Sequence, residues 1–283
     1  MKTEKNSGKL SLTNNGELEL FFIGTGSAFA KNLYQTNFLI IKGDTHILVD
    51  FGITGPAALR EIAGLDVTDI EVVLPTHSHS DHTGGIEGLA LMNRYVGRRF
   101  MNKPLMKMIV TEDYQKLLWE ESLKGGLACN ELSDDPSGLL TCSDFFESVH
   151  PALKKNCSRQ VFEINYNGIQ LELFRTFHIP EGADSWVTSL PSYGLFIDNR
   201  IFFSGDTQFD QDLIDMYANK SEIMIQDIQF FTGGVHVSLE ELQGLPSAIK
   251  KKMMLVHYND AWSEKDISEF GGWCHQGIKY IFP

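Results

Sequence analysis

A short segment in the first third of the chain gathers four side chains that can bind a metal ion. They follow the apolar run Glu71–Leu74 directly and lie within six residues: His77, His79, Asp81 and His82. Neutral imidazoles and carboxylates are the usual protein ligands of zinc and similar divalent ions. A solvated polar turn is the alternative interpretation of any one of them, but the H-x-H-x-D-H spacing after a buried strand favours a metal site.

Three later residues also stand at the end of an apolar run, namely His178, Asp206 and His257. Taken alone, each has a simpler interpretation, as a structural histidine or, for the aspartate, as a turn residue or helix cap. Because loops at strand ends can reach one rim of a sheet, we expect these three side chains to join the first four. Two cations held side by side lower the pKa of a shared water, so that hydroxide forms near neutral pH.

The whole pattern resembles the signature of the metallo-β-lactamase-fold hydrolases, whose third histidine, bridging aspartate and last histidine follow in this order. The resemblance covers nearly the whole chain and implies an α/β (α+β) fold, a four-layer αββα sandwich with a dinuclear metal site. The implied cofactors are two divalent ions, zinc first, with manganese or iron suiting the same ligands. By this resemblance one ion is held by His77, His79 and His178, the other by Asp81, His82 and His257, and Asp206 bridges both.

The N-terminal region narrows the resemblance to one branch of the superfamily. The stretches Phe21–Ala28, Asn37–Ile40 and Leu48–Gly52 resemble the opening of ribonuclease Z and its relatives, and the segment His77–Gly85 matches the same branch. The loop Gly24-Thr25-Gly26 follows a strand and can bring backbone N–H groups near a phosphate. A tight turn explains that loop at least as well.

The resemblance also assigns catalytic roles. In ribonuclease Z-like proteins an acidic residue on a late strand partners a histidine that is not a metal ligand and is thought to protonate the leaving oxygen. Asp227 and His236 resemble a compact version of this pair, as orienting carboxylate and general acid. The ligand Asp81 is expected to orient the attacking water or accept its proton. The alternative is that His236 caps the following helix, or that Ser238 does so with Glu241.

The interval from His178 to Asp206 departs from ribonuclease Z, which carries its flexible, lysine-rich tRNA-binding arm there. Here the interval is short and has no basic cluster, and the net charge of −13 weakens long-range attraction of a phosphate backbone. We therefore discount tRNA binding. By resemblance to arm-less relatives that open cyclic nucleotides, including phage enzymes that degrade cyclic pyrimidine signals, we expect a phosphodiesterase for a small phosphodiester such as a cyclic nucleotide, acting by metal-hydroxide attack on phosphorus.

Three other functions remain open on these residues. A hydrolase of carboxylic esters, thioesters or lactones would use the same metal site but would not need the Asp227 and His236 pair. A ribonuclease Z-like endonuclease for RNA 3′ processing and a metal-binding sensor without turnover are the others. Basic residues between Arg94 and Lys107 form either a phosphate-facing patch or a solvated helix face. Aromatic residues near the motifs could stack a base, although most aromatics belong in a core: Phe29, Tyr34, Trp186, Phe230, Phe231 and Tyr258.

Short strands joined by turns must position these residues. We expect one domain over residues 1–283, with an insertion or lid at about 120–160, where the pattern is weakest. The predicted strands are Leu18–Ile23, Asn37–Ile41, His46–Asp50, Glu71–Leu74, Val161–Ile164, Ile169–Phe177, Tyr193–Ile197, Ile201–Phe203, Glu222–Gln226 and Met253–His257. The predicted helices are Pro56–Ala63, ending at Gly64, Ile86–Tyr95, Glu112–Lys124, stopped by Gly125-Gly126, Leu239–Leu242 and Ser263–Phe270.

Composition agrees with a globular protein. Hydrophobic residues make up 42% of the 283 residues and charged residues 22%. Because no apolar run approaches about 18 residues and Met1–Asn15 is polar, we expect neither a membrane span nor a secretory signal. The four cysteines are irregularly spaced, which favours free thiols and a cytoplasmic protein. A homodimer is implied by the family alone.

Overall fold

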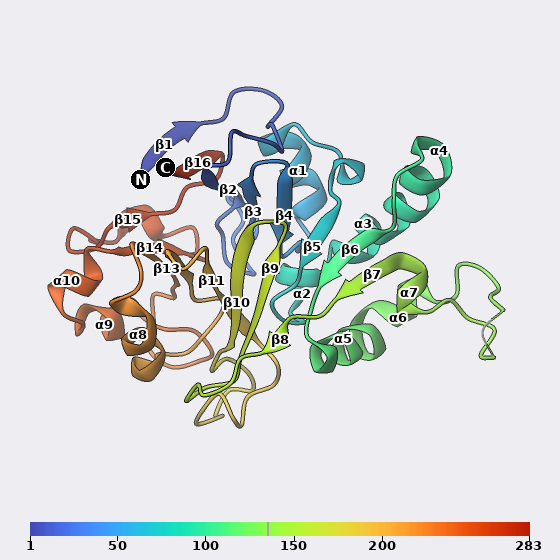
Figure 1. The fold of residues 1–283 in the computed structure, drawn as a ribbon. Coiled ribbons are helices and arrows are strands. Elements are labelled where there is room, and N and C mark those ends of the chain that lie inside the picture. The colour runs from blue at the N-terminus through green and yellow to red at the C-terminus, as the bar shows by residue number, and fades with distance from the viewer. Residues whose placement is uncertain (135) are drawn as a thin grey trace. The chain divides into compact units, whose positions relative to one another are not determined.

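The computed structural model describes residues 1–134 and 136–283, and the chain forms two compact units. Unit 1 comprises Met1–Gly24, Gln35–Pro151 and Gly277–Pro283, and unit 2 comprises Thr25–Tyr34 and Ala152–Gln276. Each unit contains one eight-stranded sheet together with helices, whose labels are given in Figure 1. The single domain expected over residues 1–283 stays a prediction.

The sheet of unit 1 is antiparallel on one side and parallel on the other. Pairing is antiparallel from β1 through β16, β2 and β3 to β4, and parallel from β4 to β7. All seven residues of β2 are buried, as expected for a strand covered on both faces. In sheet order the strands are β1 (Lys2–Lys5), β16 (Ile278–Phe282), β2 (Leu18–Gly24), β3 (Asn37–Lys42), β4 (Thr45–Val49), β5 (Val72–Leu74), β6 (Met106–Ile109) and β7 (Phe146–Val149).

Three helices were predicted in unit 1, and two of them run past their predicted ends. The one predicted over Ile86–Tyr95 continues through a π-helical turn to Met101. The first, α1 (Gly55–Ala63), ends at Gly64 in the left-handed conformation, as predicted. The helix predicted to stop at Gly125-Gly126 instead runs on to Leu127. Glycine lowers helix propensity without preventing the helical conformation, and the side chain of Leu127 is fully buried. The others are α2 (Ser80–Thr83), α3 (Ile86–Met92), the π-helical turn Asn93–Arg98, α4 (Arg99–Met101), α5 (Glu112–Leu118), the π-helical turn Trp119–Leu123, α6 (Lys124–Leu127), α7 (Cys142–Phe145) and the 3₁₀ turn Val67–Asp69.

The sheet of unit 2 has the same mixed character. Pairing is antiparallel from β8 to β12 and parallel from β12 to β15. Strands β9 and β10 form a hairpin, and its turn contains Asn167 at φ 49° and Gly168 at φ 91°. In sheet order the strands are β15 (Gly272–Trp273), β14 (Met253–Val256), β13 (Ile223–Asp227), β12 (Ile201–Phe203), β11 (Tyr193–Ile197), β10 (Ile169–Arg175), β9 (Val161–Tyr166) and β8 (Ala152–Leu153).

Helices α8 (Gln211–Ala218), α9 (Leu239–Gln243) and α10 (Ser247–Lys250) belong to unit 2. Its core is aromatic: the ring of Phe174 stacks on that of Phe202 at 5.3 Å between centroids, and Tyr217 of α8 packs on Phe174 at 4.8 Å. The carboxylate of Asp210 accepts the N–H of Leu213 and so caps α8. This packing fixes the strand ends that carry the later candidate residues.

The helix predicted over Ser263–Phe270 is wrong. Only a 3₁₀ turn forms there, at Trp262–Glu264. The side chain of Asp266 accepts the N–H of Ser268, a local bond that competes with helix formation. The glycines Gly271 and Gly272 follow, and the second of them opens β15.

The region near 120–160, expected to be an insertion or lid, contains the end of the helix that α5 begins, then α7 and the two edge strands β7 and β8. These strands are only two to four residues long, so their sequence alone did not reveal them. Its interpretation as an insertion stays a prediction. Within the described parts of the chain, no helix has the length and apolarity to cross a membrane.

Candidate metal centre

The four clustered candidates of unit 1 lie in the loop after β5 and in the short helix α2. His79 is the residue before α2, and Asp81 and His82 lie within it. The ring of His77 lies 4.8 Å from that of His79 and 4.2 Å from that of His82, between centroids. The side chains of His77 and His82 are fully buried, whereas His79 is half-buried. The structure therefore brings these imidazoles together at one strand end, as the sequence predicts.

Asp50 orients His82, a role that the sequence did not reveal. Its carboxylate accepts the Nδ1–H of His82 at 2.7 Å and both the backbone N–H and the hydroxyl of Thr76, at 2.7 and 2.8 Å. With Nδ1 held in this way, Nε2 is the nitrogen of His82 that can bind a metal. Burial raises the pKa of the Asp50 carboxyl, and the bonds from His82 and Thr76 oppose that shift.

Gly52 explains how Asp50 approaches the metal-binding loop so closely. A Cβ atom at Gly52 would lie 2.0 Å from the backbone oxygen of Asp81, so only glycine fits. Next to it, the N–H of Phe51 donates to the backbone oxygen of His82 at 2.6 Å. Asp50 itself has φ 58°, an unusual backbone conformation for a non-glycine residue. A charged residue directly after a buried strand was the available signal for this role.

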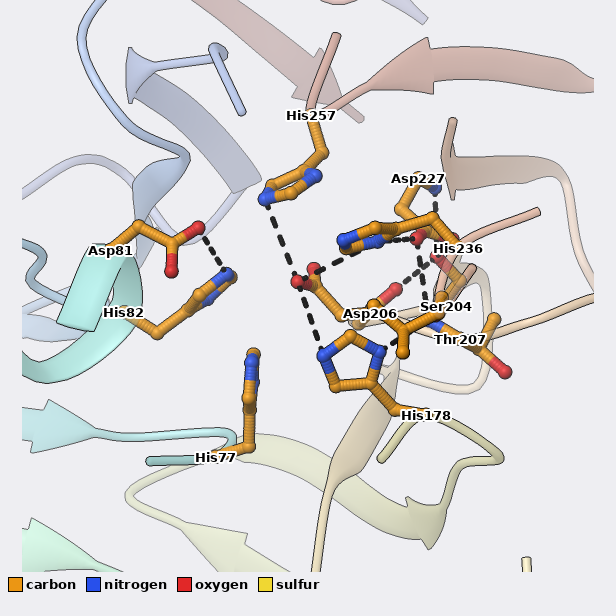
Figure 2. Close-up of polar contacts among 12 residues, drawn as sticks. His77, Asp81, His82, His178, Ser204, Asp206, Thr207, Asp227, His236 and His257 are labelled. Atoms are coloured by element: carbon orange, nitrogen blue, oxygen red, sulfur yellow. Dashed lines mark hydrogen bonds and ion pairs between the residues drawn. The ribbon is translucent and has the colours of Figure 1, made fainter. Parts of the chain in front are cut away.

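In unit 2 the two later histidine candidates, His178 and His257, both face one carboxylate oxygen of the third candidate, Oδ2 of Asp206 (Figure 2). The Nε2 atom of His257 lies 3.5 Å from it and Nε2 of His178 lies 3.8 Å from it. The other ring nitrogen of His178, Nδ1, donates to the backbone oxygen of Val235 at 2.8 Å. This bond leaves the Nε2 atom of His178 turned toward Asp206. The structure therefore brings these three residues together within unit 2, and their role as metal ligands stays a prediction.

The backbone on either side of the cluster is constrained. Gly205, at φ 59°, precedes Asp206, and a Cβ atom there would lie 2.4 Å from the backbone oxygen of Tyr193. His257 has φ 61° directly after β14. Non-glycine residues in this conformation carry a cost that surrounding structure must offset, and they concentrate at functional sites.

Asp227 and His236, the predicted catalytic pair, are in contact. The Nδ1 atom of His236 donates to Oδ2 of Asp227 at 2.9 Å, and it also lies 3.8 Å from Oδ2 of Asp206 (Figure 2). Burial raises the pKa of Asp227, and the hydrogen bond from His236 opposes that shift. The other oxygen of Asp227 accepts from the side chains of Gln226 and Ser204, at 2.9 and 3.3 Å.

The alternative that His236 caps helix α9 is wrong. Ser238 is the cap, because its hydroxyl accepts the N–H of Glu241 at 3.2 Å while the carboxylate of Glu241 accepts the N–H of Ser238 at 2.8 Å. The ring of His236 takes no part in this capping box, and it contacts Asp227 and Asp206 instead. The side chain of His236 is 19% exposed, so solvent or a ligand can reach it.

The donor atoms in unit 2 suit a divalent cation. Asp206, Asp227, His236 and His257 offer ligand atoms that all lie within 4.8 Å of one another. The separations of 3.5 and 3.8 Å around Asp206 exceed those of N–H···O hydrogen bonds. They are close to about 3.3 Å, the edge of a tetrahedron whose metal–ligand bonds are about 2.0 Å long. The pairing of ligands from both units round two ions stays a prediction.

Comparison of the sequence with known proteins gives a consistent family. Residues 18–278 match the family model described as "Anti-Pycsar protein Apyc1". The protein of that name from Bacillus phage BSP38 is 36% identical over 247 residues, which cover 86% of this chain and 89% of the phage protein. The one from Paenibacillus sp. (strain J14) is 34% identical over 258 residues, covering 90% and 93%.

Comparison of the structure with solved structures shows the fold. The metallo-β-lactamase fold protein YhfI from Bacillus subtilis superposes with a TM-score of 0.67 at 14% identity, covering 94% of this chain and 99% of that one. A diphosphatase from the PhnP family has a TM-score of 0.67 at 12% identity, covering 94% and 97%. The chain therefore has the mixed α/β metallo-β-lactamase fold that the sequence predicts. On its sequence match, the chain belongs to the Anti-Pycsar protein Apyc1 family.

Proposed function

We propose that this protein is a metal-dependent phosphodiesterase for small phosphodiesters, with cyclic nucleotides as the leading substrates. The observation that carries the proposal is the hydrogen bond between His236 and Asp227 beside Asp206. Such a pair can deliver a proton to a basic leaving oxygen next to a metal-binding carboxylate. A phosphodiester with an alkoxide leaving group needs this proton, whereas a thioester, whose thiolate leaves readily, does not.

The proposed metal ligands are the seven residues predicted from the sequence. When bound, the two ions would supply a nucleophilic water at neutral pH and neutralise charge on the phosphate oxygens. One ion is assigned to His77, His79 and His178, the other to Asp81, His82 and His257, with Asp206 shared. Zinc, manganese and iron all suit these nitrogen and oxygen donors.

The protein's own residues supply the remaining steps. His236, held by Asp227 through Nδ1, transfers a proton from Nε2 to the departing ribose oxygen. Asp227 fixes the tautomer and the orientation of that ring and stabilises its cationic form. Asp81, whose Oδ2 lies 3.4 Å from Nε2 of His82, orients the attacking water or accepts its proton.

Two proteins with the same fold are named for phosphate chemistry, whereas the preference over carbon esters rests on the pair of His236 and Asp227. The diphosphatase from the PhnP family and the short form of human tRNase Z, with TM-scores of 0.67 and 0.62, are both named for cleavage of phosphate bonds. At 12% and 15% identity they share the fold alone with this chain. The net charge of −13 and the short interval after His178 favour a small substrate over tRNA.

A substrate panel tests the proposal. Metal-loaded protein, in zinc and manganese forms, is incubated with 2′,3′- and 3′,5′-cyclic nucleotides, bis-p-nitrophenyl phosphate, a tRNA precursor and a set of lactones and thioesters. The proposal expects turnover of the cyclic nucleotides with kcat/KM far above that for any carbon ester. Cleavage confined to the carbon esters would contradict it, and preferred cleavage of the tRNA precursor would contradict the assignment to a small substrate.

A further inference from the structure

Three phenylalanines are exposed in the described parts of the chain, and two of them lie on loops next to the candidate metal centre. Phe29 is 91% exposed, Phe231 is 63% exposed, and the third is Phe100, at 76%. Phe29 and Phe231 both belong to unit 2, as do His236 and His257. A ligand that covered either ring would remove apolar surface from water, which is favourable.

The loop that carries Phe29 is fastened beside His257. The N–H of Ser27 donates at 3.0 Å to the backbone oxygen of Tyr258, the residue that follows His257. The carboxylate of Asp260 accepts the backbone N–H groups of the two residues at 31 and 32, at 2.9 and 3.0 Å. Phe29 lies in the turn between these anchors, and two residues of chain from Ser27 span at most about 7 Å. The backbone at Phe29 is therefore held near Tyr258, the neighbour of His257, while the ring remains exposed.

The loop that carries Phe231 is fastened beside His236. The side-chain amide of Gln229 donates to the backbone oxygen of Phe231 at 2.9 Å and also to that of Gly233. The ring of Phe231 lies against Gly234, where a Cβ atom would be 3.6 Å from the ring edge. These contacts hold the ring against Gly234, two residues before His236 on the same loop.

The neighbouring aromatic residues Phe230 and Tyr258 are packed into the fold, unlike Phe29 and Phe231. Phe230 packs edge-on against Trp273 at 6.1 Å between centroids. Tyr258 is 1% exposed, and its hydroxyl forms a hydrogen bond with Thr25 at 3.0 Å. Both serve the core of unit 2, so of the aromatic residues near these loops Phe29 and Phe231 are the ones presented to solvent.

We propose that Phe29 and Phe231 are specificity-determining residues that contact the nucleobase of the substrate. Every base offers a flat apolar face, and stacking on an aromatic side chain recognises that face without reading its edge. The inference rests on the proposed phosphodiesterase function and deepens it, because it restricts the substrates to phosphodiesters that carry a base. The hydrogen bonds that anchor both loops favour such a contact, since they reduce the conformational freedom lost on binding.

Substitution of each ring tests the proposal on two matched substrates. The variants are Phe29→Ala, Phe231→Ala and the conservative Phe29→Tyr and Phe231→Tyr, with Phe100→Ala as the control for loss of an exposed ring. The substrates are a 3′,5′-cyclic nucleotide and the 3′,5′-cyclic phosphate of a base-free ribose analogue. Each alanine variant should raise KM for the nucleotide by about 5- to 100-fold with little change in kcat, and should leave the base-free substrate unaffected.

Binding of a nucleoside 5′-monophosphate to the metal-loaded variants provides a readout independent of turnover. Its dissociation constant should rise with the alanine variants, recover with the tyrosine variants and stay at the wild-type value in Phe100→Ala. Unchanged nucleotide KM and affinity in both alanine variants would overturn the inference while the wild type still cleaves phosphodiesters. A wild type that cleaves neither cyclic phosphate would instead contradict the proposed function itself.

Light scattering separates base contact from a subunit contact. The inference expects the same molar mass for the wild type and all five variants. A lower mass for Phe29→Ala or Phe231→Ala, together with equal losses on the base-bearing and base-free substrates, would assign that ring to an interface between copies of the chain and overturn the proposal.

Discussion

The Nδ1 atom of His236 lies 2.9 Å from Oδ2 of Asp227, and the same oxygen also accepts the N–H of Thr207 at 3.3 Å. Asp227 is fully buried, whereas the ring of His236 is partly exposed. A buried carboxylate behind an accessible imidazole fixes which nitrogen faces the reactants. The pair therefore has the geometry of an oriented proton donor.

Replacing His236 by alanine should separate substrates by their leaving groups. Cleavage of a 3′,5′-cyclic nucleotide, which releases a basic alkoxide, should slow by about 10²- to 10⁴-fold. Cleavage of bis-p-nitrophenyl phosphate, which releases a weakly basic phenolate, should change by about threefold or less, because it needs no proton in the transition state. Steady-state kcat on both substrates checks this, and equal losses would remove the proposed role.

Asp227 should act through His236 and not independently of it. Asp227→Asn alone should slow cyclic nucleotide cleavage, since the amide no longer holds the ring in one tautomer. Added to His236→Ala, it should cost almost nothing more, as residues that act as a unit are strongly non-additive. The control Ser238→Ala removes the cap of α9 and should lower stability by about 1 kcal/mol without any dependence on the leaving group. Additive rate losses in the double variant would disprove the coupling.

Asp50→Asn should weaken metal binding through His82. The carboxylate now accepts from both His82 and Thr76, and an amide can satisfy only part of this set. Loss of such a partner typically lowers metal affinity by about 10- to 100-fold. Titration against a competing chelator measures the effect. Asp69→Asn, which removes an exposed ion pair with Lys9, is the matched control and should leave affinity unchanged; equal affinities in both variants would refute the role of Asp50.

His46 should make the stability of the fold depend on pH. Burial lowers the pKa of His46 below its usual value of 6.5, and the attraction of the Glu71 carboxylate opposes this shift. The Nε2 atom of His46 accepts the backbone N–H of Glu71 at 3.1 Å. The unfolded chain therefore binds a proton near pH 6 that the folded chain does not. The stabilisation is fully present above about pH 6.5 and is lost as the pH falls toward the lowered pKa, at up to about 1.4 kcal/mol per pH unit.

His46→Gln tests this because glutamine keeps an acceptor for Glu71 but does not titrate. Urea unfolding between pH 7.5 and 5.5 should show a shallower loss of the free energy of unfolding in the variant than in the wild type. Parallel curves for the two proteins would mean that His46 does not carry the dependence.

The sequence revealed the candidate ligands because their signal is local. His77, His79 and His82 share one short segment, and Asp206 and His257 each follow a strand that is apolar enough to recognise. Asp50 was missed as a functional residue because its role depends on a contact with His82, 32 residues away, that Gly52 permits. A hydrogen bond between residues so far apart in the chain produces no motif or periodic pattern in the sequence.

The errors in the fold have an equally physical origin. The predicted helix at Ser263–Phe270 had helical spacing, but the Asp266 side chain satisfies the N–H of Ser268 locally. Strands β7 and β8 were missed because edge strands of two to four residues carry too little alternation to recognise. Pairing with β6 and β9, not their own sequence, makes them strands.

The central claim is that the protein hydrolyses a phosphodiester by attack of water on phosphorus with the help of bound metal. The most direct measurement is turnover of a 3′,5′-cyclic nucleotide in ¹⁸O-labelled water by the metal-loaded protein, with mass spectrometry of the product. The account predicts a linear nucleotide with one ¹⁸O atom on its phosphate, formed in the metal-loaded protein and absent after chelation. A metal-loaded protein that forms no such product, but hydrolyses thioesters or lactones, would contradict it.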